Sequence, residues 1–476
     1  MGVQHHSDAD ARGLFHLARA LIVAEPPSKF SRIKNYFDDL LPFAEQHGLI
    51  LRVLVHSKSE VSQISAIKEA GIKRSGRGWS IETFYAQRLA DVAEKIAREY
   101  VGPQHLPKTI IKCTSGSISN KKRILLRRAF YDCSKVLLEP LRGGKASEGV
   151  FLAHAWIEGA FLARRPLPFF VKFAGVSDIE VERQNYRLWV EPYIPFQLRP
   201  NVNHRRCVRG SMLSALVGNF VEDAIPLREA LRKGVASGTL FSLFEVTLKG
   251  LRAQPFARTA LKTTAGLDMF VRRRVRVQEL EKRRPEVIGL ARKLGLKSTP
   301  REMEEKLCEE AKDVSYWQGP MHGDLHDGNV MVRRSDAIVI DFGSIDEWGP
   351  LTADPAALEV SLAFRTDDAD RSTFKEWRIF INKAYDCIPR LRPPNPESDP
   401  TPMSWLHRAL REIRHILFGC DCADKEAAIV LASYLMRFAR LSLEDLKSQR
   451  LFRLALQRHA YALVVAERIV AVIPKL

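Results

Sequence analysis

The chain has 476 residues, of which 46% are hydrophobic and 27% charged, enough for two or three folded units with apolar cores. No apolar stretch reaches membrane-spanning length, the N-terminus lacks a basic-then-apolar signal, and His6 breaks an N-myristoylation match, so a cytoplasmic protein is expected. The 7 Cys are scattered without CxxC pairs, so neither a zinc site nor a disulfide framework is indicated.

The net charge is strongly positive, at +18. Basic side chains gather in several clusters: Lys121–Arg123, Arg127–Arg128, Arg205–Arg206, Arg272–Arg274 and Lys282–Arg284. They are either solvated helix faces or surfaces for a polyanion or protein partner. No RNA-recognition aromatic motif accompanies them, so nucleic-acid binding is the secondary hypothesis.

Residues 1–135 predict a small α/β domain. Residues 20–24 and 49–55 are apolar runs typical of buried strands, and apolar residues at helical spacing lie between them at 33–44. A second helix is expected directly after an N-cap at Ser80, followed by a strand at 109–113. Strands alternating with helices favour a parallel sheet, and we expect a regulatory or docking role. Glu25 stands alone after the first strand, so phosphate acceptance there is unsupported.

A glycine-rich segment follows the next predicted strand, at 136–141. Gly143, Gly144, Ser147 and Gly149 lie in a turn whose backbone N–H groups could bend over phosphates. Most such turns simply connect strands, which is the alternative interpretation. The stretch from Gly149 to the next strand is longer than a tight connection needs. Either a β-hairpin with an extended tip or a misplaced glycine loop explains that length.

Lys172 lies inside the apolar, aromatic run 168–173, which predicts a strand. A helix is expected from about Ser177, with acidic residues in its first turn. Glu180 and Glu182 are both candidate partners for the lysine. Further along, the apolar run 213–220 is followed by a new helical pattern from 222.

The segment 321–343 concentrates polar residues with a recognisable chemistry. It reads Met-His-Gly-Asp-Leu-His-Asp-Gly-Asn from 321 to 329 and Ile-Asp-Phe-Gly from 340 to 343. Phosphoryl transfer needs a carboxylate that orients the attacking hydroxyl and oxygen ligands that hold Mg²⁺. Asp324 suits the first task, and Asn329 and Asp341 suit the second.

The residues between these motifs predict a β-hairpin. Apolar runs at 330–332 and 337–340 flank a polar turn. Asn329 then precedes the first strand and Asp341 follows the second, so pairing of the strands would bring both together. The alternative interpretation is a surface hairpin with acidic turns.

HGDLHDGN followed by IDFG resembles the aminoglycoside phosphotransferase branch of the protein-kinase-like superfamily. Protein kinases usually carry lysine two residues after the catalytic aspartate, whereas this chain has His326. The chain also passes from Gly343 almost directly into a helical pattern at 354, which leaves no room for a peptide platform. The short Trp348-Gly349-Pro350 segment resembles the bacterial ternary-complex-associated kinase-like branch.

This resemblance implies a fold and a division into domains. The expected fold class is α+β, a bilobal protein-kinase-like fold preceded by the small α/β domain of residues 1–135. A β-rich N-lobe would span 136–221, with backbone at 219–221 meeting adenine. A helical C-lobe would span 222–476 and contain the catalytic hairpin 321–343, with Asp354 supporting the catalytic segment. Long apolar stripes at 427–432 and 456–473 are expected to form its core.

The resemblance also implies roles for single residues. Lys172 would pair with nucleotide phosphates and with Glu182, which the family spacing favours over Glu180. The glycine-rich turn would cover the phosphates, Asp324 with His322 would form the catalytic set, and Asn329 and Asp341 would hold Mg²⁺.

The implied activity is an ATP-dependent transfer of the γ-phosphoryl group to a hydroxyl of an acceptor, small molecule or protein, that the sequence does not identify. A polycationic acceptor is disfavoured by the basic charge of the chain. The alternatives are a catalytically silent nucleotide-binding signalling module and a basic nucleic-acid-associated regulator.

Overall fold

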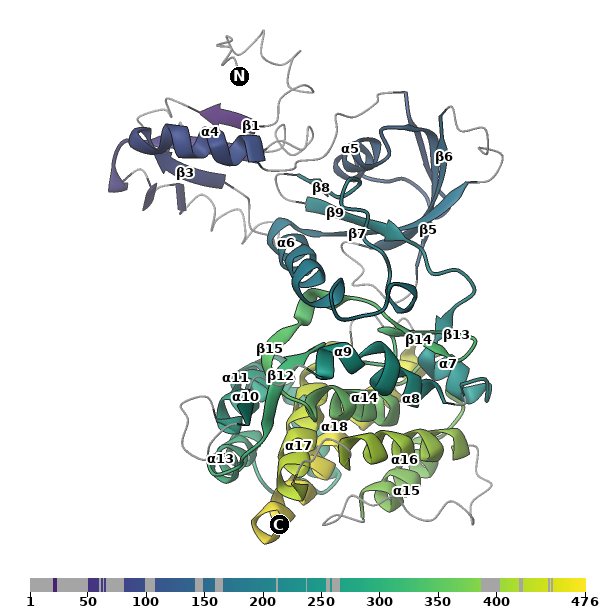
Figure 1. Cartoon of the computed structure of the whole chain (residues 1–476). Coiled ribbons are helices and arrows are strands. Elements are labelled where there is room, and N and C mark those ends of the chain that lie inside the picture. Colours follow the sequence, from purple (N-terminus) through teal and green to yellow (C-terminus); the bar gives the residue numbers. More distant parts are fainter. Residues whose placement is uncertain are drawn as a thin grey trace. The chain divides into compact units, whose positions relative to one another are not determined.

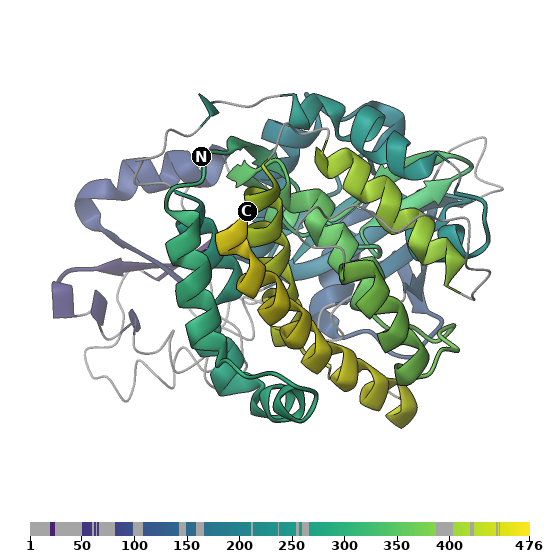
Figure 2. The same ribbon diagram turned by 90° about the horizontal axis from the view of Figure 1, so that it is seen from below.

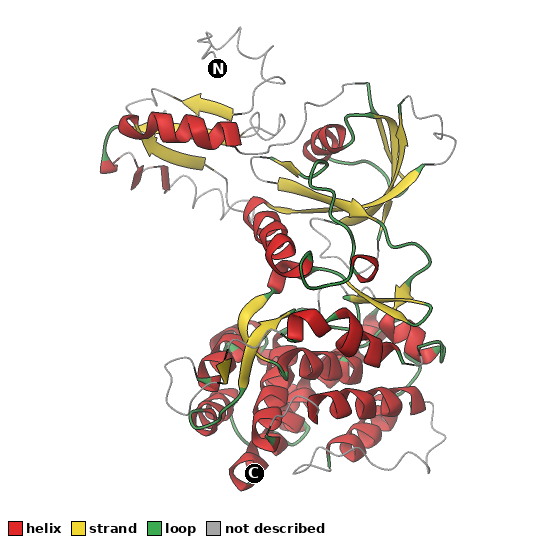
Figure 3. Ribbon diagram, in the orientation of Figure 1, coloured by secondary structure: helices red, strands yellow, loops and turns green. Residues whose placement is uncertain are grey.

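The computed structural model describes residues 20–23, 50–59, 61–62, 64–65, 81–98, 108–141, 149–158, 166–210, 213–236, 238–253, 257–258, 266–386, 403–418, 423–443, 446 and 448–476. The chain divides into two compact units (Figure 1). Unit 1 comprises Met1–Gln184 with Pro200–Val221, and unit 2 comprises Asn185–Arg199 with Glu222–Leu476. Strands dominate unit 1 and helices dominate unit 2 (Figure 3). The predicted α+β class is confirmed.

Unit 1 begins with a three-stranded parallel sheet in the order β1-β2-β3. Its elements are β1 Ala20–Val23, β2 Ile50–Val55, β3 Ile81–Tyr85, a 3₁₀ turn Ala86–Arg88 and α4 Leu89–Arg98. The parallel sheet agrees with the prediction. The helix expected from Ser80 was wrong in its first turns, because the alternating, β-branched and aromatic residues from Ile81 to Tyr85 pair with β2. The predicted helix at 33–44 lies outside the described residues.

A six-stranded sheet forms the larger part of unit 1, in the order β4-β5-β6-β7-β9-β8. Its elements are β4 Ile110–Cys113, α5 Asn120–Ala129, β5 Cys133–Pro140, β6 Val150–Ile157, β7 Leu167–Gly175, α6 Val176–Asn185, β8 Val208–Arg209 and β9 Leu213–Asn219. β4 pairs in parallel with β5, and the other neighbours are antiparallel. The expected boundary at residue 135 therefore falls inside β5, and β4 belongs to this sheet because its backbone groups pair with β5.

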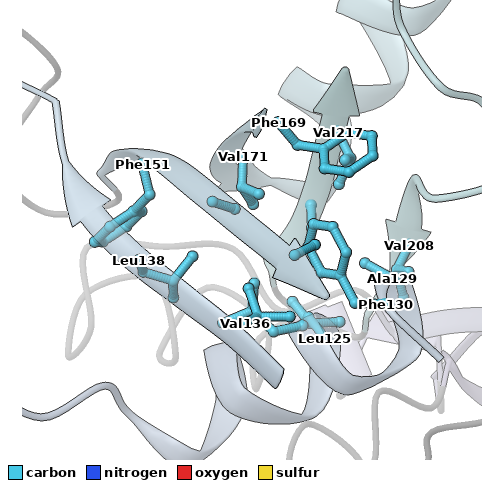
Figure 4. Packing of buried hydrophobic residues seen from close by; sticks show 14 of the residues in the cluster. Leu125, Ala129, Phe130, Val136, Leu138, Phe151, Phe169, Val171, Val208 and Val217 are labelled. Carbon is cyan, nitrogen blue, oxygen red and sulfur yellow. The ribbon is translucent and has the colours of Figure 1, made fainter. Parts of the chain in front are cut away.

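The core of unit 1 lies between α5 and one face of this sheet (Figure 4). Val136, Leu138 and Val171 alternate along their strands with less buried neighbours, as a half-buried sheet requires. Phe130, which caps α5, meets Phe169 edge to face at 5.5 Å between ring centroids. Burying each such aromatic side chain contributes about 1.5–3 kcal/mol, so α5 is held on the sheet mainly by apolar packing.

Unit 2 contains two small sheets, β10-β13-β14 and β11-β12-β15, among many helices. Its strands are β10 Ile225–Pro226, β11 Ala257–Arg258, β12 Trp317–Met321, β13 Val330–Arg333, β14 Asp336–Val339 and β15 Asp346–Pro350. Its α-helices are α7 Leu227–Arg232, α8 Thr239–Ser242, α9 Lys249–Arg252, α10 Leu267–Val275, α11 Val277–Arg283, α12 Pro285–Lys293, α13 Pro300–Ala311, α14 Ala353–Phe364, α15 Phe374–Tyr385, α16 Ser404–Phe418, α17 Asp424–Arg440 and α18 Gln449–Val472. Short π or 3₁₀ segments span Tyr186–Val190, Phe196–Leu198, Leu243–Thr247, Phe342–Ser344 and Ile473–Lys475.

Helix α14 is the centre of unit 2, because every one of its residues is buried. A helix that is buried on all sides must be surrounded by other elements, and α16 and α17 both pack against it. Its one buried acid in the second turn, Glu359, is paired with Arg414 of α16 at 2.8 Å. Arg414 also donates to the backbone oxygen of Ala384, so this ion pair ties α14, α15 and α16 together.

The two predicted apolar stripes near the C-terminus form α17 and α18, which lie side by side (Figures 1 and 2). Most of their residues are buried, which confirms that these stripes belong to the core. In the part of the chain that the structure describes, no helix combines the length and the apolar character needed to span a bilayer.

Candidate active site

The hairpin predicted from 330 to 340 is confirmed as β13 and β14. Val330 pairs with Val339 and Arg333 with Asp336, and Arg334 takes a positive φ of 60° in the turn. At the open end, the Ile340 amide donates to the Asn329 backbone oxygen at 3.0 Å. Strand pairing therefore brings the residues before and after the hairpin together, as the sequence predicted.

The loop before the hairpin is closed by hydrogen bonds of Asn329. Its backbone amide donates to the His326 oxygen at 2.8 Å, and its side-chain nitrogen Nδ2 donates to the Asp324 oxygen at 3.0 Å. Asn329 is 6% exposed. Because Nδ2 is used in this way, Oδ1 is the atom of Asn329 that a metal ion would bind.

Asp354, near the start of α14, binds the backbone of the same loop through its carboxylate. Its carboxylate accepts from the amides of His322 at 2.7 Å and of Gly323 at 3.1 Å. The buttressing role expected of Asp354 is confirmed. Gly323 has a φ of +78°, and a Cβ there would lie 2.0 Å from the Ser344 oxygen, so the position accepts only glycine. Arg274 of α10 donates to the Gly323 oxygen at 2.9 Å.

His322 is fully buried beneath the loop. Its Nδ1 accepts from the Asp324 amide at 3.3 Å, so its Nε2 carries the proton and donates to the Ile340 oxygen at 3.0 Å. Both ring nitrogens are thus bonded to backbone on the two sides of the hairpin opening. The sequence placed His322 in the catalytic set. In the structure, both ring nitrogens contact backbone groups, a geometry that suits positioning of the loop.

Asp324 is the acid of this loop that reaches solvent, with 38% of its side chain exposed. Its Oδ1 lies 2.7 Å from the guanidinium nitrogen of Arg437, near the end of α17. Burial alone would raise the pKa of Asp324, but Arg437, together with His326 and His322, holds it below its ordinary value. The carboxylate is therefore ionised at neutral pH.

Arg437 was not found from the sequence. It lies 113 residues beyond Asp324 and carries no local motif. An arginine in the last turn of a helix is ordinarily explained by the helix dipole, so nothing in its own sequence context points to Asp324.

Asp341 lies at the other end of the hairpin, in the left-handed region with φ 65° and ψ 74°. Aspartate adopts this region more readily than most residues. The carboxylate is exposed, while the next residue, Phe342, is buried and lies 5.4 Å from the His322 ring. The Phe342 oxygen accepts from Asn185 Nδ2 at 2.9 Å. Buried packing of Phe342 therefore fixes the backbone that presents Asp341.

The side-chain oxygens at the two ends of the hairpin fit a magnesium ion that is also bound to the phosphates of a nucleotide. Such an ion takes one or two protein oxygens and completes its shell with phosphate and water. Asn329 Oδ1 and the Asp341 carboxylate are ligands of that type, on segments joined by the Ile340–Asn329 hydrogen bond. Among the described residues, no group of three or more His, Cys, Asp or Glu is arranged to hold a metal, so a protein-only cage is not present there.

A second acidic residue of the loop has a structural role. Asp327 is buried and bonded to Arg228 at 2.7 Å, to Ser361 of α14, and more loosely to Arg365 at 3.4 Å. Burial opposes its ionisation, but the Arg228 and Arg365 guanidinium groups hold its pKa far below the usual range. Asp327 thereby fastens the loop to α7 and α14, a role the sequence did not reveal.

In unit 1, the predicted Lys172–Glu182 ion pair is confirmed. Lys172 Nζ in β7 lies 2.8 Å from Glu182 Oε2 in α6. The Glu182 side chain is 8% exposed, whereas that of Glu180 is 58% exposed and reaches Arg183 at 3.8 Å. The prediction that Lys172 pairs with Glu182, and not with Glu180, is therefore confirmed for this ion pair.

The glycine-rich turn is described only at its end. Gly149 has a φ of +81°, and its oxygen accepts from the Phe173 amide at 3.2 Å, next to Lys172 in sequence. Gly143, Gly144 and Ser147 lie outside the described residues. The turn lies between β5 and β6, whereas the long connection that follows Gly149 contains β6 and leads into β7. β6 and β7 pair as antiparallel neighbours, which agrees with the extended-tip interpretation of that connection.

The expected adenine-binding backbone at 219–221 is partly occupied by the sheet itself. The Asn219 amide donates to the Asn201 oxygen at 2.9 Å, and the Phe220 amide donates to the Pro168 oxygen at 3.3 Å. These two donors are engaged within unit 1, because β9 continues its pairing to this point. An adenine contact through either amide would require that bond to break.

Comparison with known proteins found a family model that matches the C-terminal part of the chain. Residues 248–472, slightly less than half of the sequence, match the model of the family ternary complex associated domain 9. This match agrees with the resemblance to the bacterial ternary-complex-associated kinase-like branch that the motifs indicated. The matched residues include the whole segment 321–343 and α17. No curated protein matches the chain.

Solved structures of phosphotransferases are similar to the chain at low sequence identity. Aminoglycoside phosphotransferase APH(4)-Ia is 14% identical, with a TM-score of 0.41 over 74% of this chain and 97% of that one. A choline/ethanolamine kinase family protein from Mesorhizobium loti is 12% identical, with a TM-score of 0.39 over 71% and 92%. Amicoumacin kinase hAmiN, in complex with AMP-PNP and Ca²⁺, is 12% identical, with a TM-score of 0.32 over 70% and 88%.

Proposed function

We propose that this protein transfers the γ-phosphoryl group of ATP to a hydroxyl group, with Asp324 as the residue that receives the hydroxyl. The observation that supports this most is the loop of unit 2. An ionised, partly exposed aspartate sits there on backbone fixed by Asn329, His322 and Asp354. Catalysis of phosphoryl transfer consists almost entirely of such positioning, together with stabilisation of charge.

In the proposed reaction, the acceptor oxygen forms a bond to the γ-phosphorus while the bond from that phosphorus to the bridging oxygen breaks. ADP leaves, and the hydroxyl proton passes to the Asp324 carboxylate. A carboxylate whose pKa is held low is a weak base, which suits a loose transition state in which the proton moves late. Its main task is then to accept the hydroxyl hydrogen bond and aim the oxygen.

The remaining residues would hold the nucleotide. Asn329 Oδ1 and Asp341 would bind Mg²⁺, which neutralises phosphate charge when present. We assign Lys172 to the nucleotide phosphates, where Glu182 orients its ammonium group through their 2.8 Å ion pair. We also propose that the glycine-rich turn covers the phosphates with its backbone N–H groups, through Gly143, Gly144, Ser147 and Gly149.

The decisive experiment compares ATP turnover by the wild type and by Asp324→Asn, which keeps the side-chain shape and removes the charge. Loss of a positioned acid–base group lowers the rate about 10²–10⁴-fold. The matched control is Asp336→Asn, the same change at an exposed hairpin turn, for which an unchanged rate is expected. Equal turnover by wild type and Asp324→Asn would overturn the enzyme proposal, and nucleotide binding without any turnover would favour the silent signalling module.

A further inference from the structure

We propose that the acceptor is a small molecule that carries a phosphate or carboxylate group near its reactive hydroxyl, and that Arg437 and Arg365 bind this anionic group. This inference rests on the proposed function, because it names the substrate class of the same site. It follows from the way in which charge is distributed around Asp324 within unit 2.

Two arginines that contact the loop of Asp324 reach solvent. Arg437 bonds to Asp324 at 2.7 Å and keeps 20% of its side chain exposed, and Arg365 keeps 43% exposed. Arg365 lies against the same loop as His326. A Cβ on Gly328 would stand 2.9 Å from Arg365 Nη1 and 3.0 Å from His326 Cε1. Both guanidinium groups are thus held at the loop that carries Asp324.

Three other acids of this region, in contrast, are buried. Asp327 is 5% exposed and bonded to Arg228 and Ser361, with Arg365 at 3.4 Å. Asp354 is 2% exposed and accepts two backbone amides, and Glu359 is fully buried against Arg414. These carboxylates therefore balance buried arginines and amides, whereas Arg437 on Asp324 and Arg365 on the 324–328 loop keep part of their guanidinium side chains exposed.

Arg437 is held in a way that suits exchange of its partner. Its guanidinium carbon lies 5.7 Å from the centroid of the buried Tyr434 ring, and its ion pair is made with the same carboxylate that must receive the acceptor hydroxyl. One turn further along α17, Arg440 is already paired with Glu279 at 2.6 Å. An anion that draws Arg437 away from Asp324 would leave that carboxylate open to the hydroxyl. A cationic acceptor would instead be repelled by both arginines.

The backbone beyond Asp341 favours a small acceptor. The described residues pass from the 3₁₀ turn Phe342–Ser344 directly into β15, and β15 pairs with β12 before α14 starts at Ala353. Between Asp341 and Ala353 the chain thus consists of a short turn and a paired strand, without a long loop that could form a peptide platform. Arginine forks match phosphate and carboxylate groups alike, so either group satisfies the site.

The test measures binding to the full-length protein saturated with AMP-PNP and Mg²⁺, at constant ionic strength. Calorimetric titrations use four hydroxyl compounds: glycerol 3-phosphate, glycerate, neutral glycerol and cationic ethanolamine. We expect at least one of the two anions to bind, with at least about tenfold higher affinity than glycerol and ethanolamine, the tenfold factor corresponding to one ion pair. The two anionic arms distinguish a phosphate from a carboxylate site.

Variants then locate the anion. Arg437→Gln and Arg365→Gln are each expected to weaken anion binding about tenfold, and Arg437→Lys to restore part of it. Arg292→Gln, the same change at an exposed site on α12, is the control and leaves binding unchanged. Thermal unfolding of each variant shows that it is folded.

Two results would overturn the inference: no preference for either anion over glycerol and ethanolamine, or equal anion binding by the wild type and both glutamine variants. Either can occur while ATP turnover still depends on Asp324, so failure of the inference is distinguishable from failure of the proposed function.

Discussion

Two ion pairs, one in each unit, show how differently long-range and local contacts arise. Lys172 and Glu182 are separated by 10 residues and meet because a strand is followed directly by a helix. Asp324 and Arg437 are separated by 113 residues and meet because α17 packs against α14, which carries Asp354 beneath the loop. The first pair follows from the order of neighbouring elements, and the second requires the packed helices of unit 2.

The two pairs also differ in their exposure to solvent. The acid of the first pair, Glu182, is 8% exposed, whereas Asp324 is 38% exposed. A buried acid that is fully paired can only hold its partner in place. An exposed acid can exchange partners, so the pair in unit 2 is the one suited to meet a substrate.

A third pair, Glu359 with Arg414, sharpens this comparison because neither partner reaches solvent. Glu359→Ala leaves the Arg414 charge buried without its counter-ion, so we expect a loss of about 3–5 kcal/mol in the free energy of unfolding. Denaturant titration of unit 2 unfolding would measure it. The control is Glu281→Ala, which removes an exposed pair with Arg301 and should leave stability unchanged. A similar small effect for both would show that burial does not set the strength of these pairs.

In unit 1, Lys172→Met is expected to lower kcat/KM for ATP by about 10²-fold, because a charge-assisted contact to phosphate is lost. Glu182→Gln should lower it less, since the ammonium group stays but loses its orienting partner. Glu180→Gln, an exposed acid on the same helix, should have no effect. Steady-state kinetics with varied ATP would measure all three. Equal effects of Glu182→Gln and Glu180→Gln would remove the proposed role of the ion pair.

Gly323→Ala tests the backbone that presents Asp324. Gly323 and Gly234 have similar φ angles, 78° and 69°, but a Cβ at Gly323 meets the Ser344 oxygen at 2.0 Å, whereas at Gly234 nothing lies within 4 Å. Gly234→Ala should cost only the left-handed backbone penalty of about 1–2 kcal/mol. Gly323→Ala should cost more than that and abolish turnover. Equal unfolding midpoints for the two variants would show that the loop can shift to accept the Cβ.

The smallest expected effect is on the pH profile of Arg437→Gln. Burial raises the pKa of Asp324 and Arg437 lowers it, so removing the guanidinium should raise that pKa. The working form is the ionised carboxylate, and activity is lost as pH falls through its pKa. The acid limb of the kcat profile should therefore move to higher pH in the variant, with a modest change near neutrality. An unmoved acid limb would mean that Arg437 does not control the ionisation of Asp324.

Folding stability is expected to depend on pH in the same direction as activity. A carboxyl whose pKa is lowered by folding stabilises the folded state above its unfolded pKa, and this stabilisation disappears as the pH falls through the folded pKa. Arg437→Gln should therefore lower stability at neutral pH and have less effect in acid. Thermal unfolding followed across pH would measure both regimes.

Much of unit 2 near the hairpin was predictable because its information is local. Apolar alternation on both sides of a polar turn defines β13 and β14, and antiparallel pairing necessarily brings Asn329 and Asp341 to the same end. Predictions failed where pairing partners were distant. Ile81–Tyr85 has apolar residues at both helical and strand spacing, and β2 decided in favour of the strand. β4 was assigned to the wrong sheet because its partner could not be read from its own residues.

Residue types and their spacing were sufficient to predict that Asn329 and Asp341 flank the open end of one hairpin and that Lys172 pairs with Glu182, since these contacts arise between adjacent turns, strands and helices. The burial of His322, the fastening of Asp327 and the approach of Arg437 depend on helices that lie far away in the chain. Such contacts depend on how whole helices pack against one another and on which charged side chains this packing buries. Neither can be predicted from a short segment of the sequence.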